Sequence, residues 1–185
     1  MTMVCGVSAV SALAVIEGIG FTHVVMIPDG ESRHLFDSFV NSSKLEVISP
    51  AREGEGVAIA AGLWVGGKKP LLVLQNTGVM EAGDTIRGCG IGPRIPLRML
   101  IGWRGYPGAV AGRLPIDSAY PYTEPLLRAW GISYWQLMTD ADLAVFGEMD
   151  AAAEHSSHRR RFYLDGRSGH DRADGTLRRA IGPED

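Results

Sequence analysis

The chain has 185 residues, of which 45% are apolar and 21% charged, and its formal net charge is −3. This composition fits an ordinary globular domain with a sizeable core and excludes a long disordered protein. So small a charge gives no strong attraction to nucleic acid or to an anionic membrane. The two cysteines, Cys5 and Cys89, indicate neither a disulfide scaffold nor a thiolate zinc site, and they suit a cytoplasmic location.

The uncharged start of the chain predicts an amphipathic helix over 7–17, ending at Gly18 and Gly20. A signal peptide is disfavoured because it begins with a basic segment, whereas the first cation here is Arg33. Strand and helix patterns then alternate. In chain order they predict strand Thr22–Ile27, a helix around Leu35–Val40, strand Leu45–Ile48, helix Glu53–Val65, strand Leu71–Leu74, helix Val79–Arg87, strand Pro96–Ile101, helix Thr123–Trp130, strand Ile132–Leu137, a helix capped by Asp140 and reaching Glu154, and a short sixth strand Arg161–Leu164.

Apolar strands separated by helices indicate an α/β fold: a single domain with a mostly parallel six-stranded sheet and helices on both faces. We place this domain at residues 1–164, because residues 165–185 lack apolar periodicity and form a polar tail. Three histidines near this end, His155, His158 and His170, have no carboxylate spacing that would support a metal site, so none is predicted.

Polar groups follow four of the predicted strands, next to glycine or proline. They lie in Pro28–Gly30, Pro50–Gly54, Gln75–Gly78 and Gly102–Gly105. Because ligands of such folds bind at the carboxyl ends of the strands, these loops together predict one site at that edge of the sheet.

Residues 53–62 carry a carboxylate at the start of a helix made almost entirely of small residues. Two interpretations follow. In one, the helix packs tightly on the sheet and Glu53 is a first-turn residue favoured by the helix dipole. In the other, Glu53 is a carboxylate held at a strand end beside a subunit interface. The residues alone leave both open.

This segment resembles the glutamate-bearing segment of the pyrimidine-binding (PYR) domain of thiamine-diphosphate-dependent enzymes. In that superfamily a Gly lies nine residues after the glutamate, and Glu53 and Gly62 have this spacing, whereas Glu55 does not. Further stretches resemble the alpha subunits of sulfopyruvate decarboxylases and the related phosphonopyruvate decarboxylases. They are Pro28-Asp29, Lys68-Lys69-Pro70, Gln75-Asn76-Thr77-Gly78, Ile95-Pro96-Leu97 and Trp103-Arg104-Gly105.

The resemblance implies a subunit of a 2-oxo acid decarboxylase, with Glu53 as the catalytic carboxylate. In this family the glutamate shares a proton with the aminopyrimidine of thiamine diphosphate, which helps the cofactor become a nucleophile. By the same resemblance Pro28, Asp29, Gln75, Asn76 and Thr77 join Glu53 in binding the cofactor. For Gln75 and Asn76, capping of their own loop is an equal alternative, because such side chains often do this. Arg104 would bind a small anionic 2-oxo acid, although a surface salt bridge is an equal alternative.

The chain lacks the Gly-Asp-Gly motif with a later Asn that holds the cofactor's diphosphate and Mg²⁺ in this superfamily. The resemblance therefore implies that Mg²⁺ is bound mainly by a partner, a pyrophosphate-binding (PP) beta subunit. It also implies self-association through PYR domains, with the 53–62 helix at the interface.

Other functions remain open at this point. A close variant is a thiamine-diphosphate-dependent carboligase or lyase subunit, and a second class is a non-catalytic PYR-like binding module. A flavodoxin-like or nucleotide-binding domain fits the alternation of elements, but the chain has no phosphate-loop fingerprint.

Overall fold

A parallel sheet lies at the centre of the structure, a computed structural model that describes residues 7–30, 32–106, 109, 112 and 117–158. Within these residues the sheet has four strands in the order β2-β1-β3-β4. They are β1 (His23–Met26), β2 (Glu46–Ile48), β3 (Pro70–Gln75) and β4 (Met99–Gly102), and all pairs are parallel. The α/β class and the parallel sheet predicted from sequence are thereby confirmed.

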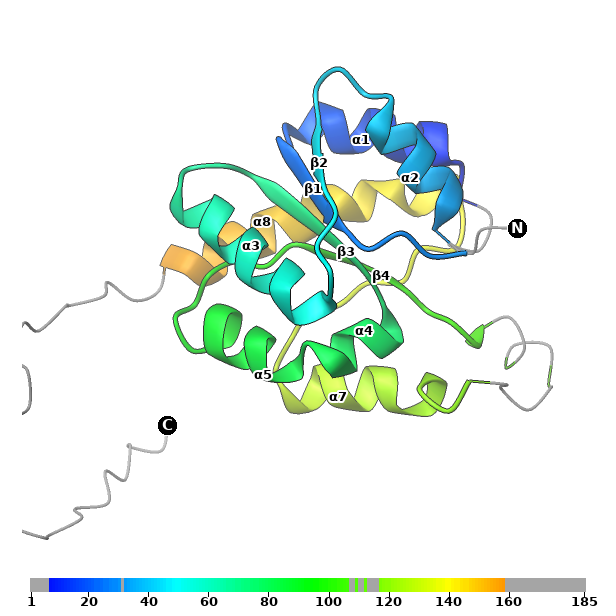
Figure 1. The fold of residues 1–185 in the computed structure, drawn as a ribbon. Helices are drawn as coiled ribbons and strands as arrows, with labels where there is room; N and C mark the ends of the chain where they lie inside the picture. Colours follow the sequence, from blue (N-terminus) through cyan, green and yellow to red (C-terminus); the bar gives the residue numbers. More distant parts are fainter. Residues whose placement is uncertain (1–6, 31, 107–108, 110–111, 113–116, 159–185) are drawn as a thin grey trace, which may run out of the picture.

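Helices cover both faces of the sheet (Figure 1). On one face lie α1 (Ala9–Ile19), α2 (Arg33–Val40) and α8 (Val145–His158), the last preceded by the 3-10 helix η3 (Asp140–Ala144). On the other lie α3 (Glu53–Val65), α4 (Asn76–Glu81), α5 (Gly83–Thr85), the π-helix η1 (Ile86–Ile91) and α7 (Thr123–Ala129), which follows the 3-10 helix η2 (Tyr120–Tyr122). In the described part of the chain no helix is long and apolar enough to cross a membrane.

The two central strands are apolar on both sides because each face of the sheet is covered. Val24 pairs with Leu71 and points into the core beneath α1 and α2. The next pair, Val25 and Leu72, points into the core beneath α3. This explains why β1 and β3 read as continuous apolar runs rather than as alternating patterns.

The strand order reverses between β1 and β3. Helix α2, which follows β1, lies on one face, whereas α4, which follows β3, lies on the opposite face. The two connections therefore diverge at the carboxyl ends of these strands, which is the position where open α/β sheets bind their ligands.

The prediction of six strands is wrong for the described residues. Residues 132–138 pair with no described strand, and a pocket lies between them and β4. An extended segment becomes a strand only when a neighbour accepts its backbone hydrogen bonds, and apolar alternation alone cannot show whether one is there. The predicted strand Arg161–Leu164 lies outside the described residues.

Two helix predictions also need correction. The helix expected over 79–87 begins three residues earlier, at Asn76, breaks at Ala82 and continues through the π-helix to Ile91. Asp140 does not cap the helix that follows it, because Thr139 is the N-cap there. The Asp140 carboxylate instead accepts hydrogen bonds from Ser8 N (2.6 Å) and Ser11 Oγ (2.7 Å) at the start of α1, which lower its pKa.

Helix α8 is fastened to the sheet by buried charges. Asp150 accepts hydrogen bonds from Lys69 Nζ and Arg98 Nε, both at 2.7 Å, and Arg98 also pairs with Glu154. Burial raises the pKa of Asp150, but the hydrogen bonds from Lys69 and Arg98 outweigh it and hold that pKa below the ordinary value. The side chain of Arg98 is fully buried, so α8 cannot leave the sheet without exposing an uncompensated charge to the core.

Candidate functional site

Glu53 is the first residue of α3, at the edge of the sheet where the strands have their carboxyl ends, and its half-buried side chain lies against Gly78 of α4. A Cβ at position 78 would stand 2.6 Å from Cγ and 2.8 Å from Oε1 of Glu53, so only glycine leaves room for this carboxylate. Among the described residues none donates a hydrogen bond to the carboxylate of Glu53. Its two oxygens therefore remain able to accept hydrogen bonds from a ligand.

The two neighbouring carboxylates are engaged within the chain. Glu55 Oε2 accepts a hydrogen bond from Ala51 N (2.8 Å), which fixes the entry into α3. Glu81 Oε2 accepts one from Gly54 N (2.8 Å), and Glu81 Oε1 accepts two from the Arg52 guanidinium. Hydrogen bonding from Arg52, followed by that from Gly54 N, lowers the pKa of Glu81. The Glu53 carboxylate differs from both, because no described residue donates a hydrogen bond to it.

Gln75, Asn76 and Thr77 lie where β3 passes directly into α4. Asn76 is fully buried; its Nδ2 donates to Thr123 Oγ1 (3.2 Å) and to the Arg104 carbonyl (3.3 Å), and its Oδ1 accepts from Thr77 N (3.1 Å). Thr77 Oγ1 donates to Gln75 Oε1 (3.0 Å). Asn76 therefore ties three segments together, which is the capping role that the sequence left open for it.

Pro28 and Asp29 follow β1, which neighbours β3 in the sheet, so they lie at the same edge as Gln75. Asp29 Oδ1 accepts a hydrogen bond from Ser32 N (2.8 Å). This contact shapes the turn that leads into α2.

Arg104 follows β4 and is held within the chain by an ion pair. Its Nε lies 3.1 Å from Asp117 Oδ2, and 53% of the Arg104 side chain is exposed, against 12% for Asp117. Beside it, the Trp103 ring stacks on Tyr120 with centroids 5.3 Å apart. Of the two alternatives left by the sequence, the salt bridge is the one the structure contains.

Glu53, the start of α4 and the Arg104 backbone therefore meet at one edge of the sheet, as the order of strands predicted. The contacts of Gly78, Glu81 and Thr123 were missed. Gly78 belongs to the motif Gln75–Gly78, in which the sequence assigns no role to the glycine. No sequence signal links Glu81 to Gly54 or Thr123 to Asn76, because these partners lie far apart along the chain. In the described ranges no three His, Cys, Asp or Glu side chains come together as metal ligands.

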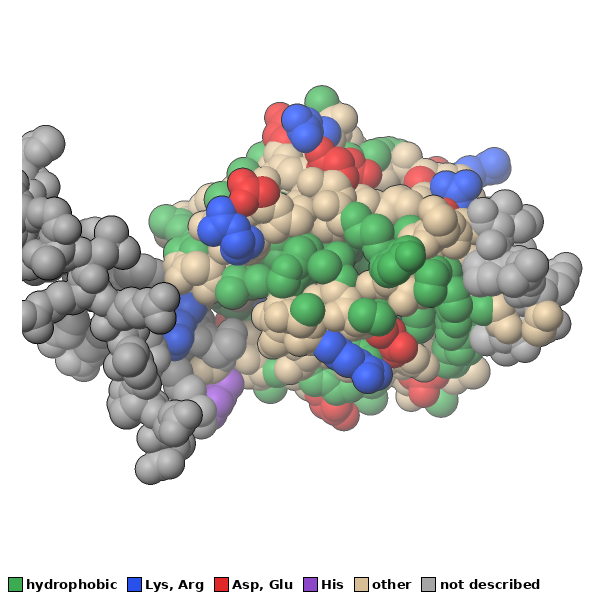
Figure 2. Space-filling model, turned by 90° about the horizontal axis from the view of Figure 1, so that it is seen from below, with side chains coloured by type: hydrophobic (Ala, Val, Ile, Leu, Met, Phe, Trp, Pro, Cys, Tyr) green, Lys and Arg blue, Asp and Glu red, His purple; other side chains and the backbone are tan. Residues whose placement is uncertain are grey.

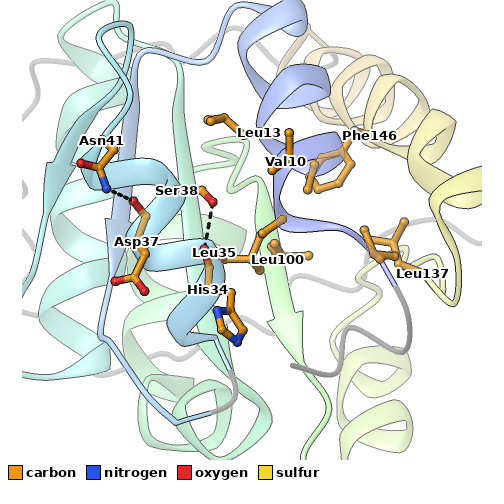
Figure 3. Close-up of a pocket in the computed structure, with 13 residues that line it drawn as sticks. Val10, Leu13, His34, Leu35, Asp37, Ser38, Asn41, Leu100, Leu137 and Phe146 are labelled. Carbon is orange, nitrogen blue, oxygen red and sulfur yellow. Dashed lines mark hydrogen bonds between the residues drawn. The ribbon is translucent and has the colours of Figure 1, made fainter. Parts of the chain in front are cut away.

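A cavity of about 690 Å³ lies away from these residues, between α1 and α2 (Figure 3). Its floor is apolar and includes Leu35 and Leu100. Two polar groups of its rim are bonded to the backbone of their own helix: Ser38 Oγ donates to the His34 carbonyl, and Asn41 Nδ2 to the Asp37 carbonyl. The cavity therefore contains none of the predicted site residues and offers few free polar groups.

Comparison with known proteins gives the relatives of this sequence. No protein-family model matches the chain. The chain is 27% identical to a phosphonopyruvate decarboxylase of Streptomyces hygroscopicus over 83% of its own length, and 30% identical to a sulfopyruvate decarboxylase of Methanosarcina acetivorans over 50%. It spans only 38% and 24% of these two relatives. It also matches the sulfopyruvate decarboxylase subunit alpha of Methanococcus maripaludis, at 24% identity over 71% of that subunit. The chain is thus similar in sequence to phosphonopyruvate and sulfopyruvate decarboxylases, the two groups that its motifs resemble.

Proposed function

We propose that this chain is the PYR-domain (alpha) subunit of a heteromeric, thiamine-diphosphate-dependent 2-oxo acid decarboxylase. The observation that carries the proposal is Glu53, a half-buried carboxylate without a described hydrogen-bond donor, lying over a glycine at the edge of the sheet where the strands have their carboxyl ends. The decarboxylase relatives support the reaction class, and the subunit-alpha relative supports a heteromeric enzyme.

The residues around Glu53 fit an aminopyrimidine. The missing side chain of Gly78 leaves a cradle in which the carboxylate lies, and a planar ring nitrogen is a suitable partner for its free oxygens. When bound, thiamine diphosphate would supply the electron sink for loss of CO₂. Glu53 would hold a proton at its carboxylate and share it with that ring nitrogen, which is acid–base catalysis. Asn76 would keep the start of α4, and so the cradle, in place.

We further propose that a PP-type partner supplies the diphosphate and Mg²⁺ ligands, and that the chain also self-associates through α3. Gly62 lies on the exposed side of α3, where a Cβ would meet nothing within 4 Å. Ala58 and Val65 are exposed on the same helix, so a second helix can approach closely there. Figure 2 shows apolar side chains gathered into a band across the side of the molecule that carries α5 and α7.

The substrate is proposed to be a small anionic 2-oxo acid. Arg104 remains the proposed ligand of its second anionic group and would have to share its guanidinium with Asp117. A charge-assisted hydrogen bond contributes about 1.5–3 kcal/mol. With the partner present, kcat/KM for CO₂ release should therefore be about 10- to 100-fold higher for sulfopyruvate or phosphonopyruvate than for pyruvate. Equal values for the three acids would contradict the proposal, and aldehyde coupling without CO₂ release from any of them would favour the carboligase alternative.

We also propose that the domain ends at residue 164. The proposal rests on the sequence, because residues 165–185 lack apolar periodicity and form a polar tail.

A chain ending at Leu164 should therefore melt close to the full-length chain in differential scanning calorimetry. A melting temperature clearly below that of the full-length chain would place the end of the domain after residue 164.

A further inference from the structure

One face of α4 meets the start of α3 at two points. Gly78 and Glu81 are three residues apart, so they lie on the same side of the helix. Gly78 provides the space in which Glu53 lies, and Glu81 contacts the residues on either side of Glu53. The position of Glu53 is therefore defined relative to a single short helix.

Glu81 holds the two neighbours of Glu53 with separate oxygens. Oε1 accepts hydrogen bonds from Nε (2.8 Å) and Nη2 of Arg52, and Oε2 accepts one from Gly54 N (2.8 Å). Gly54 also fits closely, because a Cβ there would stand 3.1 Å from Thr85 Oγ1 and 3.6 Å from Glu81 Oε2. The side chain of the residue before Glu53 and the backbone amide of the residue after it are thus bonded to the same carboxylate.

This contact replaces a cap that the local sequence does not provide. The first N–H groups of a helix have no partner within it, and Arg52, the N-cap residue of α3, makes no side-chain cap hydrogen bond. Glu81 caps the Gly54 N–H from another helix, and its negative charge at the N-terminus of α3 is favoured by the helix dipole. Without Glu81, the first turn of α3 would lose this cap and its hydrogen bonds to α4.

We propose that Glu81 is a positioning residue, which together with Arg52 fixes the Glu53 carboxylate over Gly78. This rests on the proposed function, in which Glu53 shares a proton with a bound ring nitrogen. Proton sharing depends on heavy-atom separation within hydrogen-bond range, and a displacement of about 1 Å can cost up to 100-fold in rate. Glu81 itself would touch neither substrate nor cofactor.

Two substitutions at Glu81 separate its two contacts. Glu81→Ala removes both, whereas the amide oxygen of Glu81→Gln can still accept from Gly54 N but cannot form the ion pair with Arg52. Asp84→Asn is the matched control, since Asp84 is an exposed carboxylate that pairs with Arg87 three residues later and contacts neither Arg52 nor Gly54. Melting temperatures of all variants show whether each one folds.

The contact is first tested in the isolated chain, without reference to activity. The Gly54 amide resonance in a ¹H–¹⁵N spectrum should shift strongly in Glu81→Ala, less in Glu81→Gln and not in Asp84→Asn. The same variants are then assayed for CO₂ release from sulfopyruvate, with the PP-type partner and thiamine diphosphate. We expect kcat to fall on the order of 10-fold or more in Glu81→Ala, with KM nearly unchanged, and Glu81→Gln to retain an intermediate kcat.

The outcomes distinguish this proposal from the proposed function. Normal kcat in a folded Glu81→Ala protein, alongside an inactive Glu53→Gln protein, would overturn the positioning role and leave the catalytic assignment intact. An active Glu53→Gln protein would overturn the catalytic assignment and, with it, the positioning role. If Glu81→Ala does not fold, Glu81→Gln and Arg52→Gln decide: equal losses in each and in the double variant support one shared contact, and additive losses contradict it.

Discussion

Replacing Glu53 with glutamine should lower turnover about 100-fold or more, the scale of a lost acid–base group. The substitution keeps the size of the side chain and its place over Gly78, so the protein should fold normally. What it removes is the ability of the carboxylate to hold and share a proton. The measurement is CO₂ release by the chain assembled with its PP-type partner, with substrate and thiamine diphosphate in excess.

Glu55→Gln is the matched control for this prediction. Glu55 lies two residues later on the same helix, and its carboxylate already accepts a hydrogen bond from Ala51 N, which an amide oxygen can also accept. Its effect on turnover should be small. If Glu53→Gln were folded and turned over normally, or if Glu55→Gln were the inactive variant, Glu53 would not be the catalytic carboxylate.

The elements that could be predicted are those whose signals are local. Helix α3 begins at Glu53 and ends at Val65, as predicted, because small residues and two terminal glycines mark it without help from the rest of the chain. Strands β1 and β3 were found because both faces of the sheet bury them, which leaves unbroken apolar runs.

The errors arise where a residue's partner lies far away in the sequence. Residues 132–138 have the composition of a strand, but pairing depends on what lies beside them. A pocket separates them from β4, so they pair with no described strand. Asp140 has the chemistry of an N-cap, yet its carboxylate accepts hydrogen bonds from Ser8 and Ser11 at the start of α1, more than a hundred residues earlier. The residue type predicts which hydrogen bonds a segment or side chain can form, and the fold determines which other segment supplies the partner.

The candidate site shows the same division. Its location could be predicted, because the carboxyl ends of parallel strands share one edge, whereas the choice of Glu53 over Glu55 stays a prediction. The individual contacts could not be predicted. Glu53 lies against Gly78, and Glu81 accepts a hydrogen bond from Gly54. These contacts join α3 to α4, which are separated in the sequence by β3, and no spacing rule connects the positions.

The second large effect concerns assembly: the isolated chain should release no CO₂ from sulfopyruvate and should bind thiamine diphosphate weakly. In the proposed enzyme this chain offers a carboxylate and a cradle for the aminopyrimidine. The diphosphate, which carries most of the cofactor's charge, needs Mg²⁺ and hard oxygen ligands at fixed geometry. Titration calorimetry with Mg²⁺ present should therefore show little heat for the chain alone. Adding a chain that carries Gly-Asp-Gly and a later Asn should restore binding and CO₂ release together.

Glu53→Gln again provides the control, because it separates assembly from catalysis. The Glu53→Gln chain should still form the complex with the partner in size-exclusion chromatography, since glutamine keeps the size of the side chain over Gly78, yet release little CO₂. Tight, Mg²⁺-dependent cofactor binding by the unaccompanied chain would contradict the division of the site between two subunits. Restored binding without restored CO₂ release by the wild-type pair would instead support the non-catalytic module, because the cradle would then hold a cofactor that this chain does not activate.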